Sequence, residues 1–197
     1  MVNQDGVAAD RFANPLPGVP LVESPFFERF FNDAQTPPEV LKIAKQLRDV
    51  GYAVIDFPDE DFNAVADSIV HDMARYFSDP SIPRQAVRED STRVQDAWEF
   101  HPLVKRLATN EKIRELLTSL YGRTAWPFQT LNFRYGSQQN YHTDAVHFSS
   151  IPERFMCGVW IALEDIELEA GPLVYYPGTH RWPIYANEHI GYEAATG

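Results

Sequence analysis

The sequence has a single cysteine and few basic residues. Because Cys157 has no second cysteine to pair with, no disulfide can form within the chain, and we expect a reducing, cytoplasmic location. Lys and Arg total 17 against 28 Asp and Glu, which gives a formal net charge of −11. This excess of negative charge argues against nucleic acid or an anionic membrane as the main partner.

Long apolar runs, targeting signals and repeats are also missing. The most apolar stretch, 155–163, is too short to span a bilayer, and the N-terminus lacks the basic start and apolar core of a secretory signal. No period of 20 to 50 residues recurs. A chain of 197 residues, 44% hydrophobic and 23% charged, is typical of a soluble globular protein with one buried core.

The N-terminal segment 1–38 contains six prolines, which prevent a continuous helix and predict a Pro-rich extension. Within it, Phe26, Phe27, Phe30 and Phe31 stand at helical spacing. We expect a short helix held to the body by aromatic burial, in preference to a lid over a substrate.

Helical periodicity dominates the rest of the first half. Apolar residues recur every three or four positions in 39–50 and 61–77, and again after Asn110, a good N-cap. Gly51 and Gly122 supply C-terminal stops for the first and last of these helices. His71 falls on a polar helix face and is expected to be a plain surface residue.

The pattern changes to alternation in the second half, with strands expected at 131–135, 155–163 and 173–176. A further strand is predicted at 52–57, and the mixed stretch 78–100 is expected to form a loop. Helices followed by strands indicate an α+β fold with a mainly β core. The strand 155–163 is apolar on both faces, as in a jelly roll or cupin-like sandwich.

His142 and Asp144 are the strongest candidates for chemistry. On an extended strand, residues two positions apart point to the same face, so an imidazole nitrogen and a carboxylate oxygen would converge. These are two of the three protein ligands in a 2-His-1-carboxylate iron site. By itself the spacing is a weak signal, and two solvated polar residues would also satisfy it.

The residues downstream of this pair make the pattern specific. They include the strand Trp160-Ile161-Ala162-Leu163-Glu164-Asp165, then Gly171-Pro172-Leu173, then the turn Pro177-Gly178-Thr179-His180-Arg181. This order resembles the phytanoyl-CoA dioxygenase family over about 130–183 and more loosely over 39–122.

The resemblance implies a double-stranded β-helix buttressed by N-terminal helices, within a single domain over 39–197 that follows the extension 1–38. It also implies iron(II) held by His142 and Asp144, 2-oxoglutarate as co-substrate, and O2. Asn132 and Trp160 resemble positions that line the co-substrate pocket, although exposure of Asn132 and core packing of Trp160 are open alternatives. Arg134 could pair with a substrate anion or lie on the surface. Related halogenases replace the carboxylate with a small residue, so Asp144 favours hydroxylation.

The third iron ligand has no clear match. His147 lies an odd number of positions from His142 on a continuing strand and should face away. His180 is expected to be structural, and His189 comes early for the distal ligand. We therefore expect that the chain is the N-terminal portion of such a domain, incomplete at its C-terminus and inactive alone, with the distal histidine and the arginine for 2-oxoglutarate beyond Gly197.

Two functions of different class follow from the sequence. The first is an iron(II)- and 2-oxoglutarate-dependent dioxygenase that hydroxylates a small organic substrate while converting 2-oxoglutarate to succinate and CO2. The second is a non-catalytic cupin-like β-sandwich that binds a ligand without turnover, because fold does not imply function. The acidic composition gives no sign of the basic mouth that an acyl-CoA requires. The oligomeric state is not predicted.

Overall fold

The structure is a computed structural model that describes residues 14–79, 81, 84–88, 91–136, 139–146, 148 and 150–183. The α-helices are α1 (Phe27–Phe30), α2 (Pro38–Val50), α3 (Phe62–Tyr76), α4 (Pro102–Ala108) and α5 (Glu111–Tyr121), and the strands are β1 (Arg84–Arg88), β2 (Ser91–Gln95) and β3 (Leu131–Phe133). Short 3-10 helices are η1 (Leu21–Glu23), η2 (Ala97–Glu99), η3 (Asp144–Val146), η4 (Leu168–Ala170) and η5 (Thr179–Arg181).

The helix boundaries predicted from local signals are confirmed. Helix α2 ends at Gly51 and α5 at Gly122, and both glycines adopt left-handed backbone angles, with φ of 91° and 73°. Side chains with a Cβ rarely adopt these angles, so glycine is the natural stop. At the other end of α5, the Ile113 amide donates to Asn110 Oδ1 at 3.1 Å. Helix α3 lies within the predicted range 61–77.

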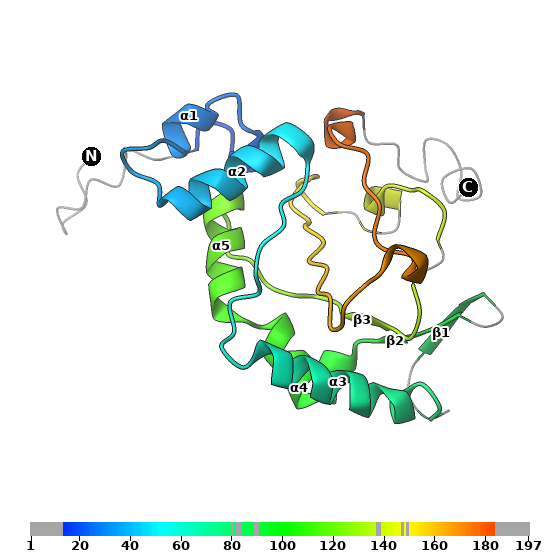
Figure 1. The fold of residues 1–197 in the computed structure, drawn as a ribbon. Helices are drawn as coiled ribbons and strands as arrows, with labels where there is room; N and C mark the ends of the chain where they lie inside the picture. Colours follow the sequence, from blue (N-terminus) through cyan, green and yellow to red (C-terminus); the bar gives the residue numbers. More distant parts are fainter. Residues whose placement is uncertain are drawn as a thin grey trace.

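The predicted aromatic burial before α2 is confirmed for Phe27 and Phe31, whereas Phe30 is half-buried and Phe26 is exposed. Phe27 and Phe31 retain only 1% and 3% of their exposure, and their rings lie 5.0 Å apart. They belong to a hydrophobic cluster formed by η1, α1, α2 and α5, with these buried members: Val22, Phe27, Phe31, Leu41, Ala44 and Leu120. Figure 1 shows this layer of blue and cyan helices against one end of α5.

A second hydrophobic cluster lies at the other end of the molecule, where α3 and α4 pack together with β2. Its buried members are Val65, Ile69, Met73, Phe77, Val94, Ala97, Val104 and Leu107. Ile161 and Leu163 pack against this cluster from the second half of the chain. The helices therefore cover one side of the segments that carry the candidate site (Figure 1).

The prediction of a loop over 78–100 is wrong, because this stretch contains β1, β2 and η2. The three strands form one antiparallel sheet in the order β1-β2-β3, and Val94 of β2 pairs with Asn132 of β3. Helix α4 was also not predicted. Its N-cap is His101, whose Nδ1 accepts the Val104 amide at 3.3 Å, and histidine is not among the residues that signal an N-cap.

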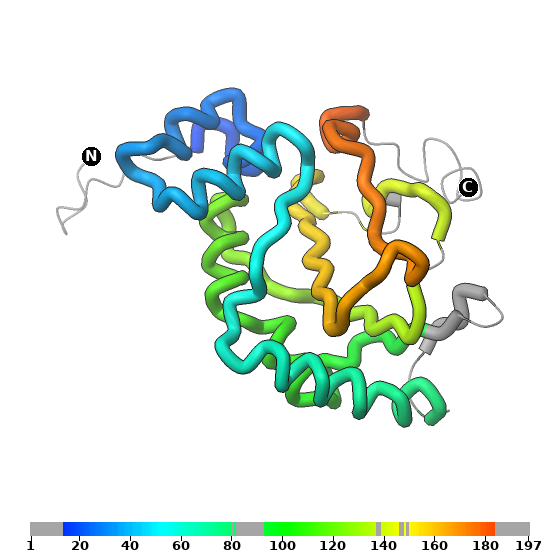
Figure 2. The backbone as a smooth tube through the Cα atoms, in the orientation of Figure 1, coloured from blue at the N-terminus to red at the C-terminus, as the bar shows by residue number. Residues whose placement is uncertain are grey.

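The strands predicted at 52–57, 155–163 and 173–176 are not formed, and that at 131–135 is shortened to β3. The first three segments are extended chain, visible in Figure 2 as the cyan, yellow and orange tubes in the centre of the molecule. A strand requires a neighbouring backbone for its hydrogen bonds, and alternation of apolar residues does not provide one. The described part of the chain is thus mixed helix with little strand, and the jelly roll stays a prediction.

Candidate metal site

His142 and Asp144 lie close together, with His142 Nε2 and Asp144 Oδ1 3.5 Å apart. They meet by a different route from the predicted strand. Residues 139–143 are outside regular secondary structure, and Asp144 begins η3, where its carbonyl accepts the Phe148 amide at 2.9 Å. The strand prediction for this segment is therefore wrong, because the chain bends into a 3-10 turn immediately after Thr143.

The tautomer of His142 follows from its second ring nitrogen. Nδ1 lies 2.6 Å from the backbone carbonyl oxygen of Asn140. A carbonyl oxygen only accepts hydrogen bonds, so Nδ1 carries a proton, and whenever the ring is neutral the Nε2 lone pair faces Asp144. This is the usual arrangement of a metal-binding histidine, in which the other ring N–H is held by a carbonyl or carboxylate.

The pair fits a divalent metal on its donor chemistry. A neutral imidazole lone pair and a carboxylate oxygen facing each other repel unless a proton or a cation lies between them. At 3.5 Å, His142 Nε2 and Asp144 Oδ1 are near enough that one cation could contact both. The Asp144 side chain is 58% exposed and that of His142 19%, so the pair is accessible from solvent.

Three residues around Asp144 were not assigned to the site from the sequence. A Cβ built on Gly158 would lie 3.6 Å from Asp144 Oδ2, so the carboxylate rests against this glycine. Burial, with a further contribution from Asp144, raises the pKa of the Cys157 thiol, although a hydrogen bond with Tyr121 opposes the shift. Burial and the same carboxylate also raise the pKa of Tyr175. Both shifts favour the protonated, uncharged forms of Cys157 and Tyr175 beside Asp144.

Sequence signals for these neighbours were present but indirect. Cys157 and Gly158 lie on the extended segment after the histidine-carboxylate pair, and Tyr175 lies on the segment before the Pro177–Arg181 turn. Alternation indicates a face of such a segment, but not which residue stands opposite Asp144. The sequence therefore places Tyr175 on the expected strand 173–176 without linking it to Asp144.

The residues predicted to line the co-substrate pocket have different environments. Asn132 lies on β3, and its Oδ1 is buried without a hydrogen-bond partner in the described part of the chain, which leaves an acceptor available for a ligand or water. Trp160 lies on the extended segment 155–163 and is 52% exposed, so it is not core packing there. Arg134 is exposed, and its guanidinium lies 5.3 Å from the centre of the Tyr135 ring.

The remaining histidines do not complete a ligand set in the part of the chain that is described. His180 Nε2 lies 3.1 Å from the Arg48 carbonyl oxygen, and His71 is exposed on α3. His147 and His189 lie outside the described residues. Among the residues that are described, no three His, Cys, Asp or Glu side chains form a group that could hold a metal.

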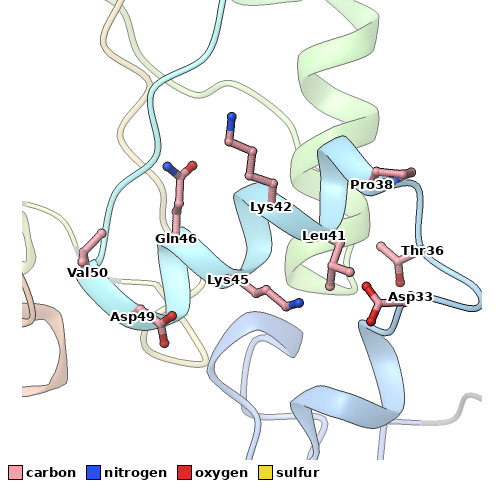
Figure 3. A pocket seen from close by; sticks show the side chains of 9 residues that line it. All are labelled: Asp33, Thr36, Pro38, Leu41, Lys42, Lys45, Gln46, Asp49 and Val50. Carbon is pink, nitrogen blue, oxygen red and sulfur yellow. The ribbon is translucent and has the colours of Figure 1, made fainter.

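A hollow of about 610 Å³ lies elsewhere, along α2 and the preceding linker, and none of the predicted site residues lines it. Figure 3 shows Lys42 and Gln46 on one side of the helix and Lys45 on the other. Because these polar side chains diverge around the helix, they do not converge on a ligand. We therefore place the candidate site at His142 and Asp144.

Comparison with protein families gives one match. The model of the family described as phytanoyl-CoA dioxygenase (PhyH) matches residues 31–196, most of the chain. The chain belongs to the phytanoyl-CoA dioxygenase family. Comparison with curated proteins and with solved structures gives no match.

Proteins of the phytanoyl-CoA dioxygenase family share a general type of chemistry. Its members are typically iron(II)- and 2-oxoglutarate-dependent oxygenases that use O2 and act on small molecules. The family implies a cupin-like jelly roll, of which the described residues show the helices and a short sheet. None of the helices in the described part of the chain has the length and apolar composition needed to cross a bilayer.

Proposed function

We propose that this protein is an iron(II)- and 2-oxoglutarate-dependent dioxygenase that hydroxylates an unactivated C–H bond of a small organic substrate. The observation that supports the proposal is the His142–Asp144 pair, in a chain that belongs to the phytanoyl-CoA dioxygenase family. The family by itself indicates oxygenase chemistry, and the pair indicates where this chain would perform it.

His142 Nε2 and an Asp144 carboxylate oxygen would hold iron(II). When bound, the iron supplies the redox chemistry that couples O2 to oxidation of 2-oxoglutarate and of the substrate. The Asn140 carbonyl keeps the proton on Nδ1, so the imidazole is prepared to bind a cation without a change of tautomer. Gly158 lies beside this carboxylate, where even an added Cβ would make only an ordinary contact of 3.6 Å with Asp144 Oδ2.

Asn132 and Trp160 are proposed to line the co-substrate pocket. The buried and unpartnered Oδ1 of Asn132 suits a polar contact, because burial without a hydrogen bond is costly and a bound ligand or water would remove that cost. The half-exposed ring of Trp160 suits an apolar wall.

Succinate formation in the natural full-length protein tests the proposal. We expect production of succinate from 2-oxoglutarate that requires iron(II), is abolished in His142→Ala, and is unchanged in His71→Ala, a histidine exposed on α3. If the full-length wild type binds 2-oxoglutarate but forms no succinate, the non-catalytic binding module is the better description. If His142→Ala forms succinate as fast as the wild type, the proposed site is wrong.

A further inference from the structure

The turn Pro177–Arg181 binds the C-terminal end of helix α2. The Gly178 amide donates to the Val50 carbonyl at 3.0 Å, and His180 Nε2 and Arg181 Nη2 reach the Arg48 carbonyl at 3.1 and 2.5 Å. Figure 1 shows this turn, η5, beside the point where α2 ends.

These contacts satisfy carbonyls that a helix cannot pair by itself. The last four carbonyls of an α-helix have no donor within the helix, and a cation near them also interacts favourably with the helix dipole. Arg181 adds an ion pair with Asp49 at 3.6 Å. The turn therefore acts as a C-cap of α2 supplied from about 130 residues further along the chain.

The His180 ring packs directly against Gly51. A Cβ placed on Gly51 would lie 2.5 Å from His180 Nδ1 and 2.8 Å from Cγ, distances that real side chains do not tolerate. A glycine is thus needed at position 51 for two reasons. Its backbone is left-handed, and the His180 ring leaves no space for a side chain. Nε2 donates to the Arg48 carbonyl, and Nδ1 is buried without a hydrogen-bond partner among the described residues.

Arg154 holds the turn from the other side. Its Nη2 donates to the His180 carbonyl at 2.6 Å, and its Nε forms an ion pair with Glu23 of η1. His180 is therefore fixed through both its ring and its backbone, between the N-terminal helical layer and the second half of the chain.

The segment that this turn anchors leads directly to the candidate metal site. Tyr175 stacks on Tyr52, with ring centres 5.3 Å apart and an angle of 10° between planes. The Tyr176 ring lies 4.9 Å from that of Tyr141, the residue immediately before His142. The end of α2 is therefore connected through η5 and the contact between Tyr176 and Tyr141 to the residue that precedes His142.

We propose that His180 is a positioning residue, which docks the 175–181 segment on α2 and thereby holds His142 in its metal-binding geometry. The inference rests on the proposed function for its importance to catalysis, but the contact between the two histidines' segments is independent of metal.

The test compares three variants of the full-length, metal-free protein by NMR of the His142 ring. His180→Ala removes the donor and the ring, whereas His180→Gln keeps an N–H donor at a similar reach. Ile69→Val, in the second hydrophobic cluster formed by α3, α4 and β2, is a control that lowers stability without changing the turn. We expect the His142 resonances to shift in His180→Ala, to return toward wild type in His180→Gln, and to stay unchanged in Ile69→Val.

Manganese(II) titration of the same variants provides the second measurement. We expect about tenfold weaker binding in His180→Ala only, the size of effect typical of groups that orient metal ligands. Unchanged His142 resonances in His180→Ala, or equal shifts in Ile69→Val, would overturn the inference. If the wild type binds no manganese while the His142 shift persists, the proposed function fails and the positioning of His142 by His180 still stands.

Discussion

We propose that Asp144 decides which reaction the candidate site supports. Its carboxylate faces His142 Nε2 and lies beside Gly158, and under the proposed function it would fill a coordination position that a small residue would leave open. In related halogenases a halide takes that position. At the scale of single residues, we therefore expect the carboxylate to favour hydroxylation over halogenation.

With chloride present, we expect the full-length protein to give a hydroxylated product and no chlorinated one. Asp144→Gly should lose hydroxylation because a metal ligand is removed, and it need not gain halogenation. Asp165→Gly is a control at an exposed carboxylate. Product analysis by mass spectrometry decides the matter, and a chlorinated main product from the wild type would refute the role given to Asp144.

At the scale of elements, α4 is joined to the segment immediately before α3 by a guanidinium bound to two carboxylates. Arg106 of α4 donates to Asp59 through Nε at 2.8 Å and Nη2 at 2.5 Å, and Nη2 reaches Asp61 at 3.2 Å. Only 6% of the Asp59 side chain is exposed. The hydrogen bond from Arg106 holds the pKa of Asp59 below its ordinary value of 3.8.

This shift predicts a loss of stability in acid. A carboxylate whose pKa is lower in the folded state contributes fully above its ordinary pKa, and the contribution is lost as the pH falls toward the folded value. Between about pH 5 and pH 3, the melting temperature of the wild type should therefore fall more steeply than that of Asp59→Asn. Asp56→Asn, at an exposed carboxylate, should keep the wild-type slope. Identical slopes for all three proteins would contradict the prediction.

Local sequence signals predicted some helices and strands correctly and others not. Helices α2 and α5 end at Gly51 and Gly122, and the Asn110 side chain caps the start of α5. These signals depend only on neighbouring residues, so the sequence predicted these helix boundaries correctly. The strand predicted at 155–163 depends on a partner backbone far along the chain, which periodicity does not specify. Helix α4 was missed because its cap is a histidine, held in place by Asp72 at 3.2 Å.

For the candidate site, the sequence predicted which two residues meet but not how they meet. The alternation argument placed His142 and Asp144 on one strand face, whereas a turn into η3 brings them together. The role of the Asn140 carbonyl could not be predicted, because backbone groups are identical at every position. The contact between His180 and Arg48 likewise joins residues 132 positions apart and required the three-dimensional structure.

At the scale of the whole molecule, the two hydrophobic clusters lie at opposite ends. The extended segments 52–57, 155–163 and 173–176 lie between the helices that form them (Figure 2). We propose that these segments belong to one oxygenase domain over 39–197, preceded by the Pro-rich segment 1–38. In this arrangement the helices provide a rigid support, and the segments that carry Asp144, Gly158 and Tyr175 meet in front of it. The acidic charge of −11 suits a substrate without strong negative charge.

The central claim is that His142 and Asp144 bind one iron(II) ion together. Anaerobic iron(II) titration of the full-length protein tests it, using wild type, His142→Ala, Asp144→Ala, the double variant and His71→Ala. We predict that each single site variant binds at least about tenfold more weakly than wild type, because even groups that only orient ligands have effects of that size. His71→Ala should bind like wild type. Equal iron(II) affinity in wild type and both single site variants would contradict the claim.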